Sequence, residues 1–561
     1  MSAVLDQRSA LTQAIEVERA GRLGDALDIA LNLMERASDD PAVRNDLGSL
    51  LNRLGRPTEA ETQFRAAMAL DPARPDYAIN AAIAATRAGF CRSALTLLYE
   101  YHDRAASLPK YWTVRANAAR SHGDLAEAER CYEKAARIDP SNAIAAQGRA
   151  QIALERGRPE ALSLFEKASQ ADPSNPYVWR GRAEALALAG EVQSALGLAR
   201  QIVGQAPQWR EGLELLAQLN LADGDTDFAA HYREAATRHP TDPAIVFDWI
   251  AVLAGLGLHE QAAEIARLGT AKFPNTPRFR LLTAVHESNA GDFARADHYF
   301  DQNASEDEEH LVHEARHRIR RSEYDDAAKA LDKVLHRHPW HLSAWALRDI
   351  VWRLTEDVRH EWLHGQSGLV QFIPLEDFAK LENRLVPALD ALHDKSSLPL
   401  GQSLRGGTQT KGQLLQRHED VFGELRAAID TTLDRYRNAL PIADIAHPLL
   451  RHRDARWSIS GSWSVRLTGG GDHHTAHIHP GGIVSSAAYL VLPERETGEG
   501  SLEIGRPPPD LFLDLPPLQT IEPQAGHLAL FPSTLYHGTT SFAAGSRMTV
   551  AFDVSAVDER R

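Results

Sequence analysis

The sequence predicts a multidomain protein in which an all-α array of helical pairs is followed by an antiparallel β sandwich or jelly roll with flanking helices. Three observations support this. A unit of about 34 residues recurs through the first 340 residues, the repeat is then lost, and polar and apolar side chains alternate after about residue 450. At 561 residues the chain is also too long for one hydrophobic core.

The repeat is marked by prolines that end helical stretches and by glycines that precede them by 16 or 17 residues. Each unit is therefore predicted to be a helix, a glycine-containing turn, a second helix and a proline stop. A small residue follows each turn, where the two helices must approach closely. The prolines are at positions 41, 72, 140, 173, 207, 240, 274 and 339, the glycines are at 55, 123, 157, 190, 224 and 257, and the small residues are Ala60, Ala128, Ala161, Ala195, Ala229 and Ala262.

This phased array resembles the tetratricopeptide repeat family over roughly residues 8–339, in nine or ten units. The clearest turn and second helix run from Gly123 to Ala135 and close with Asp139 and Pro140. The resemblance implies a right-handed superhelix of helix pairs whose concave face holds a peptide or a partner protein. The alternative is an array that only rigidifies or dimerises the protein.

Residues 340–450 are predicted to be the helical N-terminal part of the second region. Helical patterns cover Trp340–Trp362, Leu375–Leu392 and Gln413–Leu440. A polar, glycine-rich segment, Pro399–Thr410, lies between the last two, and such a loop is more often functional than a bare connector. It is not a phosphate loop, because no Gly-Lys-Ser/Thr follows.

After about residue 450, short segments with period-two alternation are separated by glycine and proline turns, a pattern typical of antiparallel strands. Many short strands in about 110 residues favour a sandwich or jelly roll. The predicted strands are Trp463–Leu467, Ser485–Leu492, Leu502–Ile504, His527–Phe531 and Met548–Val554.

Three histidines and an arginine in this region are spaced like the residues of a strand-built iron site. His477 and His479 are two residues apart and, on a strand, would point to the same face, so both can reach one metal ion. His537 returns from a later strand and completes a facial cluster with open positions. Arg547 follows ten residues later. The sequence therefore predicts a metal centre with ligands His477, His479 and His537.

The order and spacing of these residues, with the segments Gly526–Ser533 and Arg547–Thr549, resemble the iron(II)- and 2-oxoglutarate-dependent dioxygenases, particularly a bacterial, prolyl-hydroxylase-like branch. The resemblance covers the last 110 residues and extends upstream through Gln402–Gln409. It implies a double-stranded β-helix (jelly roll) over residues 451–561, with Fe(II), 2-oxoglutarate and O2 as cofactors and ascorbate as a candidate supporting reductant. The implied reaction couples decarboxylation of 2-oxoglutarate to hydroxylation of a C–H bond.

Carried over residue by residue, the resemblance implies further roles. Arg547 would hold the far carboxylate of 2-oxoglutarate through a bidentate pair, for which a planar guanidinium is suited. Thr549, on the same strand face, would add a hydroxyl donor, and Tyr489 is a candidate for a further co-substrate contact. Arg405 and Gln409 are candidate substrate contacts, with stabilisation of their own loop as the alternative.

The chain departs from the family pattern at His479, where the family has Asp or Glu. A neutral third imidazole would leave the metal site more positive. Three interpretations remain open: His479 is a ligand, His479 stands aside and leaves two histidines and water, or the site is degenerate. Asp472 is a poor substitute carboxylate, because it lies outside the strand pattern.

Simpler interpretations apply to neighbouring residues and to the domain. His473 and His474 fit a histidine-rich surface loop, and Arg466 fits an ion pair. The domain could also be a metal-binding jelly roll without oxygenase activity, attached to a repeat scaffold. A cupin-type three-histidine dioxygenase would share the metal ligands without requiring Arg547.

Composition limits the classes of binding partner and the cellular compartment that are expected. A net charge of −15 argues against binding to nucleic acid or to a membrane surface. No long apolar run predicts a membrane span, and the N-terminus has no apolar core of signal-peptide length. The two cysteines, Cys91 and Cys131, lie far apart, so a reducing cytoplasm is expected.

The order of the two regions predicts how a substrate arrives. A peptide-binding array before an oxidising domain suggests that the repeats deliver a protein substrate, with Pro, Asn or Asp side chains as targets. The aspartyl/asparaginyl hydroxylases resemble this arrangement in domain order, which is an analogy only. A small-molecule substrate is the alternative.

Overall fold

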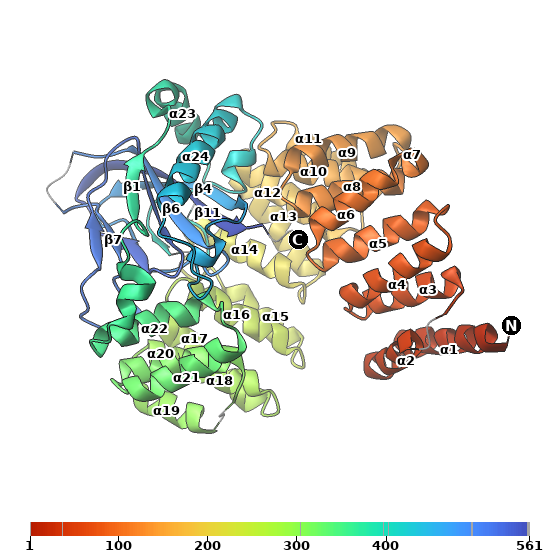
Figure 1. The fold of residues 1–561 in the computed structure, drawn as a ribbon, viewed down its shortest axis with the longest axis horizontal. Coiled ribbons are helices and arrows are strands. Elements are labelled where there is room, and N and C mark those ends of the chain that lie inside the picture. Colours follow the sequence, from red (N-terminus) through yellow and green to blue (C-terminus); the bar gives the residue numbers. More distant parts are fainter. Residues whose placement is uncertain are drawn as a thin grey trace. The chain divides into compact units, whose positions relative to one another are not determined.

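The computed structural model describes residues 2–35, 38–302, 305–396, 398–401, 403–494 and 498–557. The chain forms two compact units, whose described parts are residues 2–181 and 182–557 (Figure 1). The last four residues of the predicted domain 451–561 lie outside the described residues. In the part that is described, no helix combines the length and the apolar character that a membrane span requires.

The first unit consists of the predicted helical pairs. Each pair joins two antiparallel helices through a tight turn, and one extra single-turn helix, α7, follows the third pair. The helices are α1 (Ser2–Arg19), α2 (Leu23–Glu35), α3 (Pro41–Arg53), α4 (Pro57–Leu70), α5 (Pro75–Arg87), α6 (Cys91–Glu100), α7 (His102–Ala105), α8 (Pro109–Ser121), α9 (Leu125–Ile138), α10 (Ala143–Glu155), α11 (Ala161–Ala171) and α12 (Pro176–Leu188), which continues into the second unit.

The second unit begins with more pairs of the same kind. In the described residues, ten pairs run from α1 and α2 to α20 and α21, in agreement with the nine or ten units predicted. The helices are α13 (Val192–Gln205), α14 (Arg210–Ala222), α15 (Ala230–Arg238), α16 (Pro243–Gly255), α17 (His259–Lys272), α18 (Pro277–Asn289), α19 (Phe293–Gln302), α20 (Glu308–Arg320), α21 (Tyr324–Arg337) and α22 (Leu342–Leu354).

The glycine turns explain the phase of the array. All six predicted glycines have a positive φ, between 66° and 86°, which an L side chain rarely adopts. Gly21, Gly89 and Gly291 share this conformation, with φ of 79°, 84° and 87°. They lie in the turns of three further helical pairs, for which no glycine was predicted. The small residues that follow the six predicted turns are at most 6% exposed, as close helix packing requires.

The C-terminal part of the second unit is an antiparallel β region with two main sheets. The larger sheet has the strand order β1 (Gln371–Pro374), β9 (His527–Pro532), β6 (Val484–Val491), β11 (Ala544–Ala556), β4 (Trp457–Gly469) and β3 (Thr408–Gln409). The smaller sheet has the order β10 (His537–Thr539), β7 (Leu502–Ile504) and β8 (Gln519–Ile521), and β2 (Leu404–Arg405) pairs with β5 (His473–His474).

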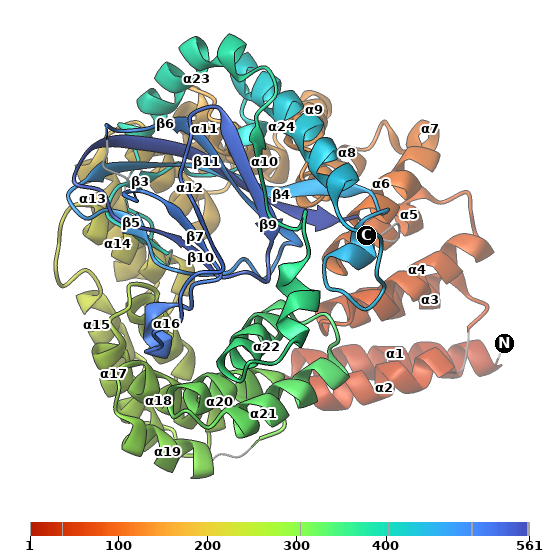
Figure 2. The same cartoon turned by 60° about the vertical axis from the view of Figure 1, so that its left-hand side comes forward.

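Two helices, α23 (Phe378–His393) and α24 (Asp420–Ala439), cover one face of the larger sheet (Figure 2). Phe422 of α24 belongs to one buried cluster with Val550 and Phe552 of β11. Side chains alternate along a strand, so the odd-numbered residues of β11 from 547 to 553 point away from the helices, toward the smaller sheet. This face of β11 carries Arg547, and it forms the floor of the candidate site.

Some predicted elements differ in extent. The helix expected over Trp340–Trp362 ends at Leu354, and a π-helical turn follows at Glu361–Gly365. The helix expected from Gln413 begins with a separate 3-10 turn, Leu414–Gln416. Strands β1, β8 and β10 were not predicted, because they lack the apolar–polar–apolar alternation that marks β7.

The last repeats of the second unit pack directly against the β region. Arg316 of α20 donates to Asp510 at 2.5 Å and to the Tyr536 hydroxyl at 3.0 Å, and Arg320 donates to Asp510 at 2.8 Å. Although burial raises the pKa of Asp510, the two guanidinium groups bring it down to about 2. Leu511 and Tyr536 are buried in one apolar cluster with residues of α20, α21 and α22.

A histidine that is locked in its neutral form makes stability pH-dependent. Nε2–H of buried His447 donates to the Leu363 carbonyl at 3.0 Å, and its Nδ1 accepts from the amides of Leu449 and Leu450 at 3.0 and 3.1 Å. A second proton would displace both amides. Burial, together with the neighbouring His364, lowers the pKa of His447 from 6.5 to about 4, against the Leu363 carbonyl, which raises it.

We therefore expect stability to fall as the pH drops from about 6.5 to about 4, because in that window the unfolded chain binds a proton at His447 that the folded chain does not. The loss is up to about 1.4 kcal/mol per pH unit for this residue. Urea unfolding at pH 7 and pH 5 measures it. His447→Asn can still accept from both amides and should lose less stability between these pH values. An equal loss in both proteins would contradict the assignment.

Candidate metal centre and its surroundings

Three histidines meet between the two sheets. His537 begins β10 and forms an isolated antiparallel bridge with His477, in which each amide donates to the other carbonyl at 3.0 and 2.9 Å. His479 follows in a segment without regular strand structure. The strand predicted at His477 and His479 is thus reduced to a single bridge, because Pro480 has no amide to continue a ladder.

The convergence predicted for these side chains is present. One nitrogen of each ring belongs to a group whose members all lie within 4.8 Å of one another, which could hold a metal ion. Nδ1 of His477 lies 2.8 Å from the Thr475 carbonyl, and Nδ1 of His537 lies 3.1 Å from the Leu535 carbonyl. Carbonyls only accept, so these Nδ1 atoms carry the protons and both Nε2 atoms keep lone pairs.

The electrostatics of the group suit a cation. The Nε2 atoms of His477 and His479 are 2.9 Å apart, and two lone pairs at that distance repel unless a positive ion lies between them. Burial and the neighbouring His479 lower the pKa of His477 to about 3. Burial, with His477 and His479 beside it, holds the pKa of His537 well below its usual range. Neutral imidazoles with converging lone pairs fit a divalent first-row metal ion.

The residues predicted to hold the co-substrate lie together on the larger sheet. Arg547 and Thr549 of β11 are 3% and 8% exposed, and Tyr489 of β6 is fully buried. The Arg547 guanidinium carbon lies 5.1 Å from the centre of the Tyr489 ring, and its Nη1 donates to the Gly500 carbonyl at 2.9 Å. Thr549 is opposite Tyr489 in the β11–β6 register. These contacts fix a guanidinium in the space between the sheets.

The glycine-rich segment predicted to be functional runs beside the histidines. Ser403 Oγ lies 3.3 Å from Nε2 of His477. Arg405 is half-buried in β2, and its charge is among the lesser causes of the low His477 pKa, after burial and His479. Gln409 is half-buried in β3 and pairs with Val465 of β4. Gln402, part of the same segment, lies outside the described residues.

The sequence also suggested roles for four polar residues near the histidines: Arg466, Asp472, His473 and His474. Arg466 forms the expected ion pairs, at 3.1 Å with Asp390 and 2.9 Å with Asp394. Asp472 accepts from the Thr468 amide at 3.0 Å and so closes a turn. The surface-loop interpretation of His473 and His474 was wrong about the loop: they form strand β5, because their backbone pairs with Arg405 and Leu404. Neither belongs to the converging group, although the His474 ring lies 5.9 Å from that of His477.

A cavity of about 570 Å3 opens beside His477, inside the second unit. On the side of the β region it is lined by Ile478 and Tyr536, and on the side of the repeats by Val312, His313 and Leu347, among others. Helices α18, α20 and α22 thus contribute to the space next to the candidate metal ligands. This contribution could not be recognised in the sequence, because the helices have the pattern of ordinary repeats.

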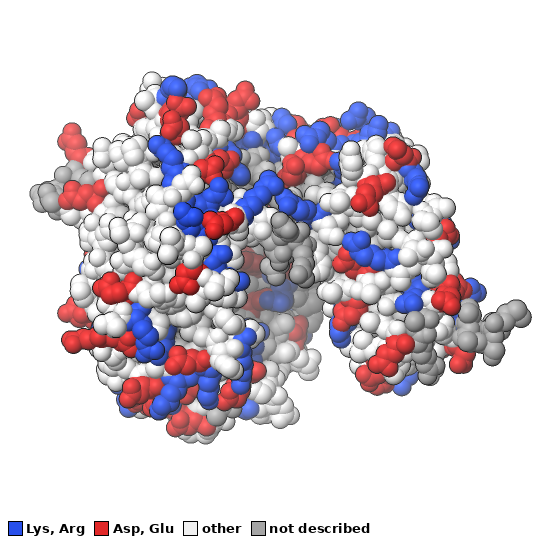
Figure 3. Space-filling model, viewed as in Figure 1, with Lys and Arg blue, Asp and Glu red and all other residues white. Residues whose placement is uncertain are grey.

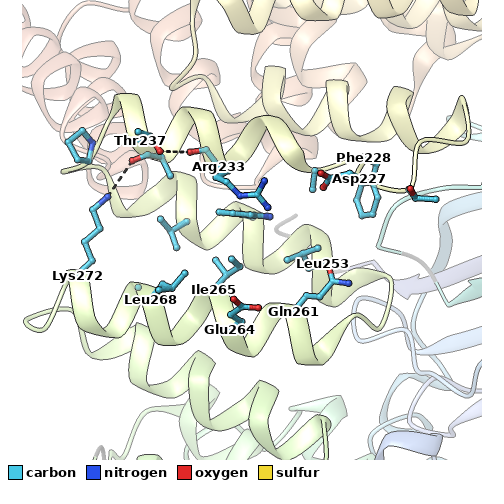
Figure 4. Close-up of a pocket in the computed structure, with 17 residues that line it drawn as sticks. Asp227, Phe228, Arg233, Thr237, Leu253, Gln261, Glu264, Ile265, Leu268 and Lys272 are labelled. Atoms are coloured by element: carbon cyan, nitrogen blue, oxygen red, sulfur yellow. Dashed lines mark hydrogen bonds between the residues drawn. The ribbon is translucent and has the colours of Figure 1, made fainter.

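A second cavity, of about 660 Å3, lies among helices α15, α16 and α17 (Figure 4). Leu253, Ile265 and Leu268 give it an apolar lining, while Arg233 and Glu264 bring charges of both signs.

On the protein face shown in Figure 3, acidic and basic side chains are interspersed.

Two residues at the histidines were not predicted from the sequence. Asp553 of β11 places Oδ1 2.6 Å from Nδ1 of His479, and the Trp463 ring stacks on His479 with centroids 5.5 Å apart and an angle of 21°. A recognisable signal for Asp553 was its period-two spacing from Arg547 and Thr549 on one strand.

The comparisons agree with both predicted regions. The family described as "Putative 2OG-Fe(II) oxygenase" matches residues 461–553, a range that contains the three histidines and Arg547. Three tetratricopeptide repeat families match residues 11–75, 109–142 and 159–219. No curated protein matches the chain. The predicted fold class, a tetratricopeptide array followed by an antiparallel region of the jelly-roll kind, is confirmed.

The chain is similar to several solved repeat proteins. A thermophilic TPR protein of Thermus thermophilus is 21% identical, with a TM-score of 0.28, covering 35% of this chain and 99% of that chain. A tetratricopeptide repeat protein of Parabacteroides merdae is 17% identical, with a TM-score of 0.36, covering 43% and 97%. Yeast Tom70 is 12% identical, with a TM-score of 0.35, covering 63% and 96%.

Proposed function

From a chain that carries tetratricopeptide repeats and a C-terminal domain matching the 2OG-Fe(II) oxygenase family, we infer an Fe(II)- and 2-oxoglutarate-dependent dioxygenase that hydroxylates a side chain of a protein substrate. The observation that carries this proposal is the convergence of three histidine nitrogens within 4.8 Å, in a domain that also buries Arg547 between its sheets. The proposed domains are residues 8–339, 340–450 and 451–561. Two free, buried thiols, Cys91 and Cys131, support a reducing, cytoplasmic location.

The proposed roles follow from the contacts of each residue. His477, His479 and His537 would hold the iron through their Nε2 atoms, with Nδ1 fixed by hydrogen bonds. Arg547 would bind the far carboxylate of 2-oxoglutarate, with Tyr489 and Thr549 beside it. When bound, iron and 2-oxoglutarate would activate O2, which is the oxidant. The protein binds and orients these groups and limits the access of water.

A protein substrate is supported by the composition of the cavity at His477. Its walls combine the β region with helices α18, α20 and α22, so a segment reaching the metal would also touch the repeats. We propose Pro, Asn or Asp side chains as targets. Arg405 and Gln409 are proposed substrate contacts. The cavity among α15, α16 and α17 is a further candidate contact for a bound partner.

Turnover of the co-substrate tests the proposal. Protein loaded with Fe(II) and 2-oxoglutarate without oxygen should show the weak visible band of a chelated co-substrate, and should release succinate once oxygen is admitted. If metal-replete protein gave neither the visible band nor succinate, the result would favour a repeat scaffold with a non-catalytic domain. To find the target, a trapping pull-down with a His537→Ala variant can be followed by a search for peptides that gain one oxygen with the wild type.

Arg547→Ala should raise the concentration of 2-oxoglutarate required far more than it lowers iron affinity. A charge-assisted bidentate pair contributes on the order of 2–3 kcal/mol. This corresponds to roughly a 30- to 150-fold weaker interaction. Arg466→Ala is the matched control, because Arg466 lies opposite Met548 on the adjacent strand and pairs with Asp390 and Asp394 instead. Equal losses of iron and co-substrate binding in Arg547→Ala would argue against the role.

A further inference from the structure

His479 is held differently from the other two histidines. His477 and His537 each donate Nδ1–H to the carbonyl two residues before them, at 2.8 and 3.1 Å. The corresponding carbonyl for His479 is that of His477, which already accepts from the His537 amide at 2.9 Å. Asp553 takes its place, with Oδ1 2.6 Å from His479 Nδ1. The third histidine therefore has a carboxylate as its acceptor where the others have neutral carbonyls.

The position of Asp553 is built into strand β11. Asp553 lies six residues after Arg547, so both side chains are on the face that points away from α23 and α24. The register of β11 against β4 shifts directly after Asp553, and such irregularities redirect side chains. In addition, Trp463 of β4 stacks on the His479 ring. His479 is thus fixed by its Nδ1 partner and by its ring face.

We infer that Asp553 is a positioning residue of the proposed metal centre, through which the site receives the negative charge that a direct carboxylate ligand would bring. This inference rests on the proposed function. A carboxylate acceptor at Nδ1 fixes the proton there and keeps the Nε2 lone pair directed toward His477. Of the three interpretations of His479 that the sequence left open, the inference selects the one in which His479 is a metal ligand.

Metal binding, measured without turnover, tests the inference. Co(II) is the probe, followed by its visible absorption and by competition with a chelator of known affinity. Asp553→Asn keeps an oxygen that can accept from Nδ1–H but removes the charge. We expect Co(II) affinity to fall about 10- to 100-fold, the usual effect of losing a partner that orients a ligand. The Co(II) absorption bands should also shift, whereas the thermal unfolding temperature should change little.

Two further variants separate charge from packing. Asp553→Glu restores the charge and should recover part of the affinity. Asp472→Asn is the matched control, because Asp472 closes a turn in the same domain and should leave binding unchanged. Co(II) affinity and spectrum like the wild type in Asp553→Asn would overturn the inference. It would also be overturned if His479→Ala bound normally while Asp553→Asn did not, since Asp553 would then be a ligand itself. Wild-type protein that binds Co(II) but releases no succinate would instead reject the oxygenase proposal.

Discussion

Replacing His537 with alanine is expected to abolish metal binding while leaving the protein folded. His537 is 7% exposed and its ring lies against that of His477, with ring centroids 4.3 Å apart. Its loss removes one of three converging nitrogens, and water would have to enter a buried space to replace it. We expect iron affinity to fall beyond the roughly 10- to 100-fold typical when only a partner of a ligand is lost. Metal content by mass spectrometry, with circular dichroism as the fold check, measures this.

The neighbouring histidines provide the comparison. His473→Ala should keep its metal, because His473 contacts the Gly471 carbonyl and does not belong to the converging group. His477→Ala and His479→Ala should lose metal much as His537→Ala does, and His479→Asp should retain some, because a carboxylate restores a ligand there. Full metal content in His479→Ala would establish a site of two histidines. Full content in His537→Ala would reject the proposed centre.

Most of the fold could be predicted because its signals are periodic. Glycines such as Gly123 recur at a spacing that only a helical-pair array explains, and Gly123 indeed has a φ of 85°. Gly89 and Gly291 were overlooked because no proline follows them at the expected distance. Strand β7 was predicted at its observed limits, because Leu502–Ile504 alternates apolar and charged side chains. Strand β10 was not predicted, because His537–Thr539 has no such alternation.

The candidate site was predictable only as far as spacing carries information. His477 and His479 are two residues apart, and His537 and Arg547 follow in the order of a known family, so their convergence could be expected. Asp553 is one of 76 acidic residues, and its contact with His479 arises from the packing of β11 beside a segment 74 positions earlier. The cavity wall formed by α20 likewise depends on how the last repeats meet the β region.

Because the last repeats pack against the β region, truncation between them is the change with the broadest expected effect on folding and metal binding. A fragment of residues 340–561 keeps α22 but loses α20, so Arg316 and Arg320 no longer pair with Asp510. The fragment therefore loses the charge-assisted hydrogen bonds of Asp510, whose side chain is already 25% exposed in the whole chain. Leu511 and Tyr536 would also lose their apolar cover. We expect this fragment to aggregate or to unfold without a cooperative transition, whatever its metal content.

A fragment that starts at Pro176 should behave differently, because it keeps α12 and all contacts within residues 182–557. We expect it to stay folded, to bind iron and to release succinate from 2-oxoglutarate at nearly the rate of the whole chain. Size-exclusion chromatography, thermal unfolding and succinate release on both fragments decide the matter. If residues 340–561 folded and bound metal as well as the longer fragment, the last repeats would be a removable attachment. If only the longer fragment does so, those repeats are a structural part of the oxygenase, and the catalytic unit begins within the array, ahead of the change in sequence pattern.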